Sequence, residues 1–147
     1  MRQDNEKIIV MSIMSYYARQ IFDGTKKFEF RKSALKPQDL NKTIYVYSAK
    51  NDKAIIGSFQ VEKVHKGTLD EILKITGYDT RPDRQEIVDY YRNCQACYAL
   101  QLTNVRRFSK PMTLNELRRL DKNIQLPQYY CYIYPKSPIY QEVVKLK

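Results

Sequence analysis

Four charged side chains follow a glycine within eight residues, in the segment GTKKFEFR. The segment alternates around two phenylalanines, so a strand here would place Glu29 and Arg31 on one face at positions i and i+2. These two side chains could pair with each other or present opposite charges to a ligand. Gly24 would let the chain turn tightly and approach that ligand, and Lys26 could supply a third polar group. The alternative is a solvated edge strand with a surface ion pair worth under about 1 kcal/mol.

Other chemical motifs are weak. The chain has four glycines and none are adjacent, which argues against a glycine-rich phosphate loop. His65 is the single histidine and has no serine-nucleophile pattern around it. Cys94 and Cys97 form a CxxC, but a zinc site would also need Cys131 and His65 as ligands, so a buried strand position for Cys97 is the favoured interpretation. The sequence therefore predicts neither a metal site nor a cofactor.

The charge balance points to polyanions. Lysine and arginine number 26 against 16 acidic residues, for a formal net charge of +10. Thirteen tyrosines and five phenylalanines could stack on bases while cations hold phosphates, so nucleic acid is favoured over incidental basicity. The candidates for backbone contacts are six cations within seventeen residues: Arg106, Arg107, Lys110, Arg118, Arg119 and Lys122. A solvated helix face is the competing interpretation of that cluster.

The length and the start of the chain set the expected class of protein. At 147 residues, a single domain over residues 1–147 is expected. No apolar run approaches the roughly 20 residues of a membrane span, and the chain starts without an apolar signal-peptide region. Three cysteines are an odd number in such a chain, so reduced thiols in a cytoplasmic protein with no membrane segment are expected.

Strands and helices are both predicted, with strands dominant. The strand segments, apolar or alternating in pattern, are 7–13, 27–31, 43–48, 54–64, 96–108 and 129–134. The helical segments are 16–23, 68–76, 84–93 and 114–121. The pattern predicts one α+β domain with helices in the connections, a core over about 7–134 and a loosely specified tail over 135–147.

Local signals mark the ends of three of these helices. Ser15 is a candidate N-cap for the first helix, and Gly24 is its natural stop. A threonine is followed three residues later by a glutamate before two helices, which is capping-box spacing. The two pairs are Thr68 with Glu71 and Thr113 with Glu116.

The pattern G-x-K-x-x-E-x-R resembles the signature of the ASCH family, a branch of the PUA-like β-barrel superfamily. The likeness extends over most of residues 7–134 and includes VMSIMSYYARQIFDG and CYALQLTNVRRFSKPMTLNELR. It implies a small, open, mixed β-barrel of about six strands with short helices, and a cleft at the motif that is proposed to hold RNA or a nucleobase. The expected partners are therefore RNA, single-stranded DNA or a modified nucleoside.

The resemblance also suggests how the cleft would work. Arg31 would donate to a carbonyl or phosphate oxygen, and Glu29 would accept from an amine or ring N–H. Stacking and polar contacts from elsewhere in the chain complete the expected site. The cleft residues are then Gly24, Lys26, Glu29, Arg31, Tyr47, Ser48 and Tyr132. For each tyrosine, a place in the core or at the barrel rim is the favoured alternative.

Catalysis is the second function class. Some ASCH proteins remove the acetyl group of N4-acetylcytidine, and another has been described as a ribonuclease. Lys26 falls on the lysine position of the amidohydrolase branch, whereas Glu29 stands where that branch has threonine. In an enzyme, Lys26 would activate the nucleophile or act as base, and Glu29 would carry a proton. A regulatory protein-interaction module is a third, weaker alternative.

Overall fold

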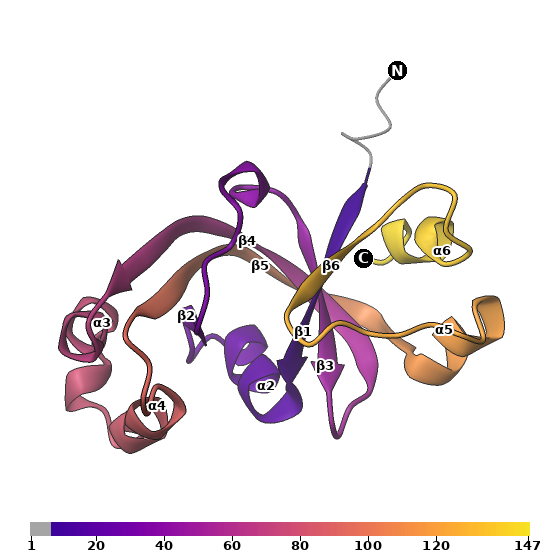
Figure 1. Cartoon of the computed structure of the whole chain (residues 1–147). Helices are drawn as coiled ribbons and strands as arrows, with labels where there is room; N and C mark the ends of the chain where they lie inside the picture. The colour runs from indigo at the N-terminus through magenta and orange to yellow at the C-terminus, as the bar shows by residue number, and fades with distance from the viewer. Residues whose placement is uncertain (1–6) are drawn as a thin grey trace. The chain divides into compact units, whose positions relative to one another are not determined.

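The computed structural model describes residues 7–147. Helices lie in several of the connections between strands along this part of the chain, as Figure 1 labels them. The strands are β1 (Ile8–Met14), β2 (Phe28–Arg31), β3 (Ile44–Ala49), β4 (Ala54–Gly67), β5 (Cys97–Thr113) and β6 (Tyr130–Ile133). The helices are α2 (Ser15–Asp23), α3 (Leu69–Thr76), α4 (Arg84–Tyr90), α5 (Leu114–Leu120) and α6 (Tyr140–Val144), with 3-10 turns η1 (Pro37–Asp39) and η2 (Tyr78–Thr80).

The strands form one mixed sheet in the order β2-β5-β4-β3-β1-β6. β1 runs parallel to β3, whereas the β1–β6, β3–β4 and β2–β5 pairs are antiparallel. The predicted α+β class with about six strands and short connecting helices is confirmed. The sheet remains open and does not close into a barrel.

The chain divides into two compact units. Of the described residues, the terminal unit comprises 7–26, 43–60 and 104–147, and the central unit comprises 27–42 and 61–103. The two long strands β4 and β5 contribute residues to both units.

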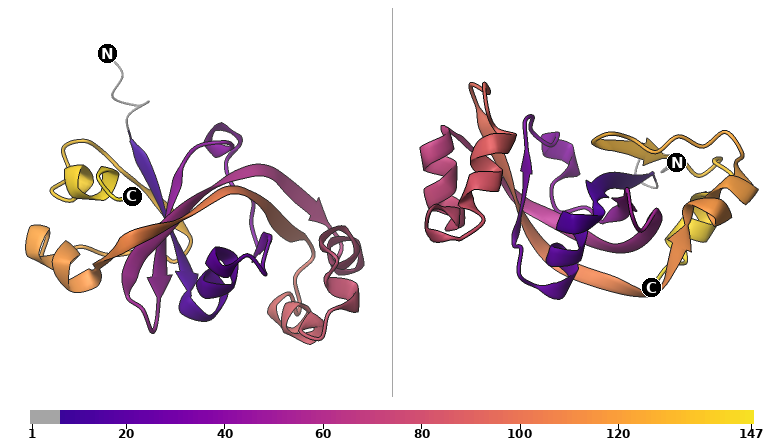
Figure 2. Two further views of the ribbon diagram at one scale, coloured as in Figure 1. Left: turned by 180° about the vertical axis from the view of Figure 1, so that it is seen from behind. Right: turned by 90° about the horizontal axis from the view of Figure 1, so that it is seen from below.

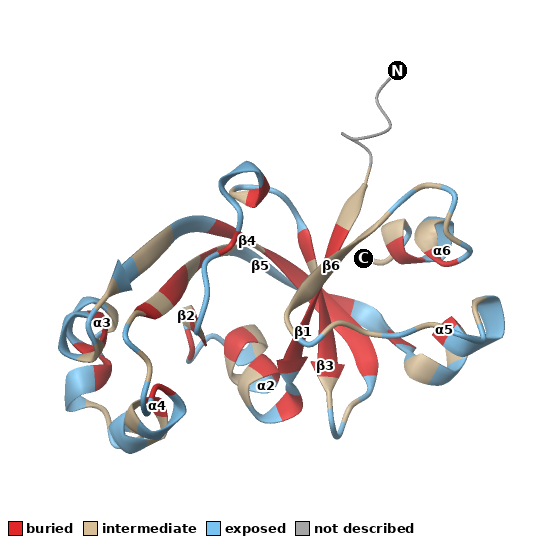
Figure 3. Ribbon diagram, in the orientation of Figure 1, coloured by how far each residue is buried: buried red, intermediate tan, exposed pale blue. Residues whose placement is uncertain are grey.

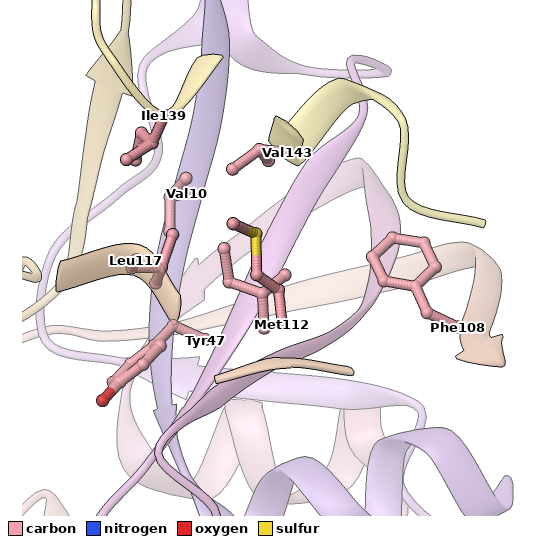
Figure 4. Close-up of a cluster of buried hydrophobic side chains, with 8 residues drawn as sticks. Val10, Tyr47, Phe108, Met112, Leu117, Ile139 and Val143 are labelled. Carbon is pink, nitrogen blue, oxygen red and sulfur yellow. The ribbon is translucent and has the colours of Figure 1, made fainter. Parts of the chain in front are cut away.

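The core of the terminal unit lies where β1, β3, β4 and β5 meet α5 and α6. Figure 4 shows the cluster, in which the Tyr47 ring and the Met112 side chain pack near Leu117. Ile139 and Val143 bring the last helix into this cluster, so the segment after residue 135 ends in a packed helix that the sequence did not predict. Burial follows the central strands of this unit in Figure 3.

The core of the central unit lies between β2, the start of β5 and the helices α3 and α4. Phe30 packs edge to face against Tyr78, with ring centroids 4.9 Å apart. Cys97 is buried in this cluster, as its strand position predicted, and all three cysteines are free thiols. Helices α3 and α4 lie beside the η2 turn in both views of Figure 2.

The helix ends follow the local signals with one correction. Both predicted capping boxes are present, and Gly24 ends α2 with φ of +91°. Ser15, however, is not the cap of α2: the N-cap position is Met14, and no side chain caps this end. The Ser15 hydroxyl instead donates to the Ala49 carbonyl at 2.7 Å, because the β3 end lies beside it. No helix within residues 7–147 combines the length and the apolar character needed to cross a membrane.

Candidate functional site

The motif begins in the terminal unit at the turn after α2. Gly24 adopts a left-handed backbone conformation that residues with a side chain rarely adopt. Its N–H donates hydrogen bonds to the Gln20 and Ile21 carbonyls. A Cβ atom on Gly24 would meet nothing within 4 Å. The glycine is therefore required by the turn geometry and not by crowding from the rest of the protein.

Lys26 follows this turn and is buried, with 3% of its surface exposed. Its backbone N–H bonds to the Gln20 carbonyl, and its ammonium lies 5.3 Å from the centroid of the Tyr17 ring. A buried ammonium loses its hydration and must be compensated by its surroundings, to which an aromatic face contributes. Lys26 is thus held by the fold in a way that an ordinary surface lysine is not.

The second half of the motif lies in the central unit, on β2. Glu29 and Arg31 form an ion pair with Oε2 and Nη2 3.0 Å apart, and their side chains are 7% and 14% exposed. β2 pairs with β5 so that Glu29 lies opposite Leu100 and Arg31 opposite Tyr98. The i, i+2 spacing therefore brings Glu29 and Arg31 together as an ion pair, one of the two arrangements that the sequence predicted. The pair is largely buried, unlike an ion pair on a solvated edge strand.

Tyr90, the last residue of α4, and Tyr91, which follows it, interact electrostatically with residues of that ion pair. Burial raises the pKa of Tyr90, with Arg31 lowering it and Glu29 raising it further. Burial also raises the pKa of Tyr91, whose hydroxyl donates to the Tyr98 carbonyl at 2.6 Å. The Glu29–Arg31 pair therefore lies on a strand paired with β5 and interacts electrostatically with the phenol groups of Tyr90 and Tyr91.

Tyr47 and Ser48 of the predicted cleft are engaged in the interior of the terminal unit. Tyr47 is 5% exposed, and its ring packs in the hydrophobic cluster. The Ser48 hydroxyl is fully buried; it donates its one proton to Asp52 Oδ2 at 2.7 Å, and its oxygen lies 2.9 Å from Ser15 Oγ. The core position of Tyr47 is the alternative that the sequence favoured, and Ser48 joins the end of β3 to the β3–β4 connection through Asp52. A ligand contact by either residue stays a prediction.

Asp52 is the centre of a polar network that sequence reasoning missed. Its N–H donates to Ser15 Oγ, and its carboxylate accepts hydrogen bonds from Arg19 and Ser48. The hydrogen bond from Arg19 is the main cause that lowers the Asp52 pKa, opposed by burial. The sequence carried only a weak signal for this network, because its residues come from separate segments that only the tertiary fold brings together.

Tyr132 lies on β6, in a row of aromatic side chains. Tyr130, Tyr132 and Tyr134 follow one another with ring centroids 6.1 and 6.4 Å apart. Lys7 places its ammonium 4.2 Å from the Tyr132 ring centroid. Of these three tyrosines only Tyr132 was predicted to line the cleft, although the alternation YxYxY over residues 130–134 was a period-2 signal for a shared face.

The predicted backbone contacts all lie in the terminal unit and are all exposed. Arg106, Arg107 and Lys110 are on β5, and Arg118 and Arg119 are on the last turn of α5. Lys122 follows that helix. None of these six cations forms an ion pair with another residue of the described range 7–147. The surface keeps its positive charge available to an external anion.

Comparison with solved structures identifies the class of fold. The ASCH protein of Zymomonas mobilis is similar with a TM-score of 0.81, at 24% identity over 97% of each chain. A mutant of the same protein gives a TM-score of 0.80, at 23% identity over 95% of this chain and 98% of that one. The N-terminal domain of Staphylothermus marinus McrB gives 0.58, at 14% identity over 92% of this chain and 93% of that one. The predicted ASCH-type α+β fold is thereby confirmed.

A family model described as "Domain of unknown function (DUF365)" matches residues 7–120. The chain belongs to the DUF365 family, and its fold is that of ASCH proteins. No curated protein matches the chain.

Proposed function

We propose that this protein is a nucleic-acid-binding domain, with RNA as the preferred partner. The six exposed cations of the terminal unit carry the proposal. Lysines and arginines that neutralise phosphates release condensed counterions, which supplies much of the affinity for a polyanion. Cations already paired with carboxylates would gain less, and none of these six lies within ion-pair distance of a carboxylate in the described chain. The net charge of +10 adds long-range attraction.

Base recognition is assigned to the Glu29–Arg31 pair. Arg31 carries donors in a planar fork, and Glu29 carries acceptors, so together they suit a base edge that offers both a carbonyl and an amine. The exposed part of the Arg31 side chain is where such an edge would meet it. The tyrosine row on β6 offers a separate stacking surface in the terminal unit, of the kind that binds single strands without sequence preference.

A binding screen tests the proposal. Labelled single-stranded RNA, single-stranded DNA and duplex RNA of equal length are titrated with the protein at 50 and 200 mM salt, and fluorescence anisotropy is recorded. We expect micromolar or tighter binding of single-stranded RNA that weakens steeply at the higher salt, because counterions are released. Absence of binding to all three at 50 mM salt would overturn the proposal.

A hydrolase acting on a nucleoside or on RNA is the second candidate, favoured by one observation. The ammonium of Lys26 is buried against an aromatic ring, and buried lysines are the ones whose chemistry departs from that of surface lysines. Against this, the carboxylate of Glu29 is engaged by Arg31. We expect no turnover of N4-acetylcytidine and no cleavage of RNA by the purified protein. Turnover that Lys26→Ala abolishes would move the protein to the enzyme class.

A further inference from the structure

A pocket of about 350 Å³ opens in the terminal unit, and no residue of the motif lines it. It spans three neighbouring strands: Thr43 precedes β3, Ser58 and Gln60 are on β4, and Asn104 and Arg106 are on β5. Its volume is at the lower end of the range for small-ligand sites. Its polar lining contains hydroxyls, amides and a guanidinium, and no carboxylate. We propose that this pocket binds an adenine nucleotide.

Two side-chain amides are fixed against each other at this pocket. Asn104 Nδ2 donates to Gln60 Oε1 at 2.7 Å. Each amide has both donors and an acceptor, so this bond leaves the Asn104 carbonyl oxygen and the Gln60 amino group for a ligand. An acceptor beside a donor complements the amine and the ring nitrogen of adenine, the pair of groups that asparagine and glutamine recognise in DNA. Guanine presents two acceptors there and would leave the Asn104 oxygen opposite another oxygen.

The hydroxyl of Ser58 adds a second, independent observation. Ser58 is 5% exposed, and its hydroxyl makes no hydrogen bond to any residue in the described part of the chain. The hydroxyl oxygen is not among the buried polar atoms that lack a partner, so it is accessible, and a ligand in the pocket that Ser58 lines could form a hydrogen bond with it. The pocket is thus polar where an occupant would supply hydrogen bonds.

The backbone at Asn104 adopts a conformation that is unusual for a strand. Asn104 has φ of +50° inside the long strand β5, whereas strand residues ordinarily have negative φ. Asparagine tolerates this conformation better than most residues, and such outliers cluster at functional sites. The conformation therefore gives a reason for asparagine at this position that is compatible with a binding role.

Arg106 supplies the charge that a nucleotide needs. Its side chain is exposed at the pocket and forms no ion pair with the described residues. It does act on Tyr45, whose pKa is raised by burial and lowered by Arg106. A guanidinium next to neutral amides favours a ligand with an uncharged ring and an anionic phosphate, which is the chemistry of a nucleotide.

Titration calorimetry with AMP, GMP, CMP and UMP tests the inference on wild-type protein and three variants. Asn104→Gly removes the amide and keeps the positive φ accessible, and Gln60→Met removes the second amide at similar length. Asn41→Gly is the matched control, because Asn41 also has a positive φ, of 62°, and lies in the central unit. Circular dichroism establishes that each variant is folded.

We expect AMP to bind roughly tenfold more tightly than GMP, since one mismatched hydrogen-bonded pair costs about that much. Asn104→Gly and Gln60→Met should each weaken AMP binding by at least roughly tenfold, and Asn41→Gly should leave it unchanged. No AMP binding at millimolar concentration, or equal binding by all variants, would overturn the inference.

The pocket deepens the proposed function if the adenine that it binds belongs to a nucleic acid. The pocket and the RNA-binding proposal are contradicted by different results. AMP binding without RNA binding would leave the pocket standing and remove the proposed function. RNA binding that is unchanged in Asn104→Gly and Gln60→Met, with no AMP binding, would remove the pocket and leave the proposed function.

Discussion

Arg31 Nη2 lies 3.0 Å from Glu29 Oε2, and the two side chains share one face of a four-residue strand. Two opposing free-energy contributions determine the stability of such an ion pair. Burial removes hydration from both charges, and the attraction between them offsets that cost only while both partners are present. The pair is therefore more sensitive to loss of one partner than an exposed pair is.

Arg31→Met should lower the free energy of unfolding by about 3 kcal/mol, because it leaves the Glu29 carboxylate without the guanidinium in a largely dry setting. Urea denaturation followed by circular dichroism measures the change. Arg92→Met is the matched control: Arg92 forms an exposed pair with Asp89 on the same unit and should cost under about 1 kcal/mol. Equal costs for the two variants would show that the motif pair behaves as a surface pair.

Asp52→Asn should destabilise the protein at neutral pH and much less in acid. The Arg19 hydrogen bond lowers the Asp52 pKa in the folded protein, so its contribution is present above the unfolded pKa of about 3.9 and is lost as pH falls through the lower, folded pKa. Thermal melts of variant and wild type from pH 7 to pH 2 measure the difference. Asp79→Asn, at an exposed position, serves as the control. A difference that stays constant over this pH range would contradict the assignment.

Gly57→Ala should destabilise the terminal unit by about 1–3 kcal/mol through overpacking. A Cβ atom at Gly57 would lie 2.5 Å from the Arg106 carbonyl oxygen and from the Phe22 ring, and the backbone oxygen cannot move aside cheaply. At Gly67 the nearest atom is the carboxylate of Glu71, 2.8 Å away at the end of a flexible side chain. Gly67→Ala should therefore cost less in the same thermal melts. The reverse order would contradict the packing around Gly57.

Much of the fold was readable from local patterns, because those patterns act through local physics. β-branched segments gave the strands, and both capping boxes formed as spaced. The helix α6 was missed because it is only five residues long and depends on the burial of Ile139 and Val143 in a core made by distant segments. The prediction that Ser15 caps α2 was wrong for a similar reason, because its hydroxyl donates to the Ala49 carbonyl, 34 residues away.

The candidate site was readable where spacing decides the geometry. Glu29 and Arg31 share a face because strand side chains alternate, and the sequence displays that alternation. Tyr47 takes the core position that the sequence favoured as the alternative, but its partners in α5 and α6 could not be read from local spacing. The Asn104–Gln60 contact joins residues 44 positions apart on neighbouring strands, and no local pattern could indicate it.

The salt dependence of RNA binding separates phosphate contacts from base contacts. If Arg118 and Arg119 contact phosphates, replacing both with alanine should weaken binding to every sequence and flatten the salt slope by roughly one unit per lost contact. Lys74→Ala combined with Arg84→Ala removes the same charge from exposed positions of the central unit and should leave the slope nearly unchanged. The slope is obtained from anisotropy titrations at four salt concentrations.

Arg31→Lys should behave in the opposite way. It keeps the charge but loses the planar fork, so it should reduce preference among bases and leave the salt slope nearly intact. Competition by homopolymers of the four bases measures that preference. A helix double variant that binds like wild type at every salt concentration would refute the phosphate role of α5. Retained base preference in Arg31→Lys would refute the base-reading role of β2, and the two outcomes are independent because the two sets of residues lie in different units.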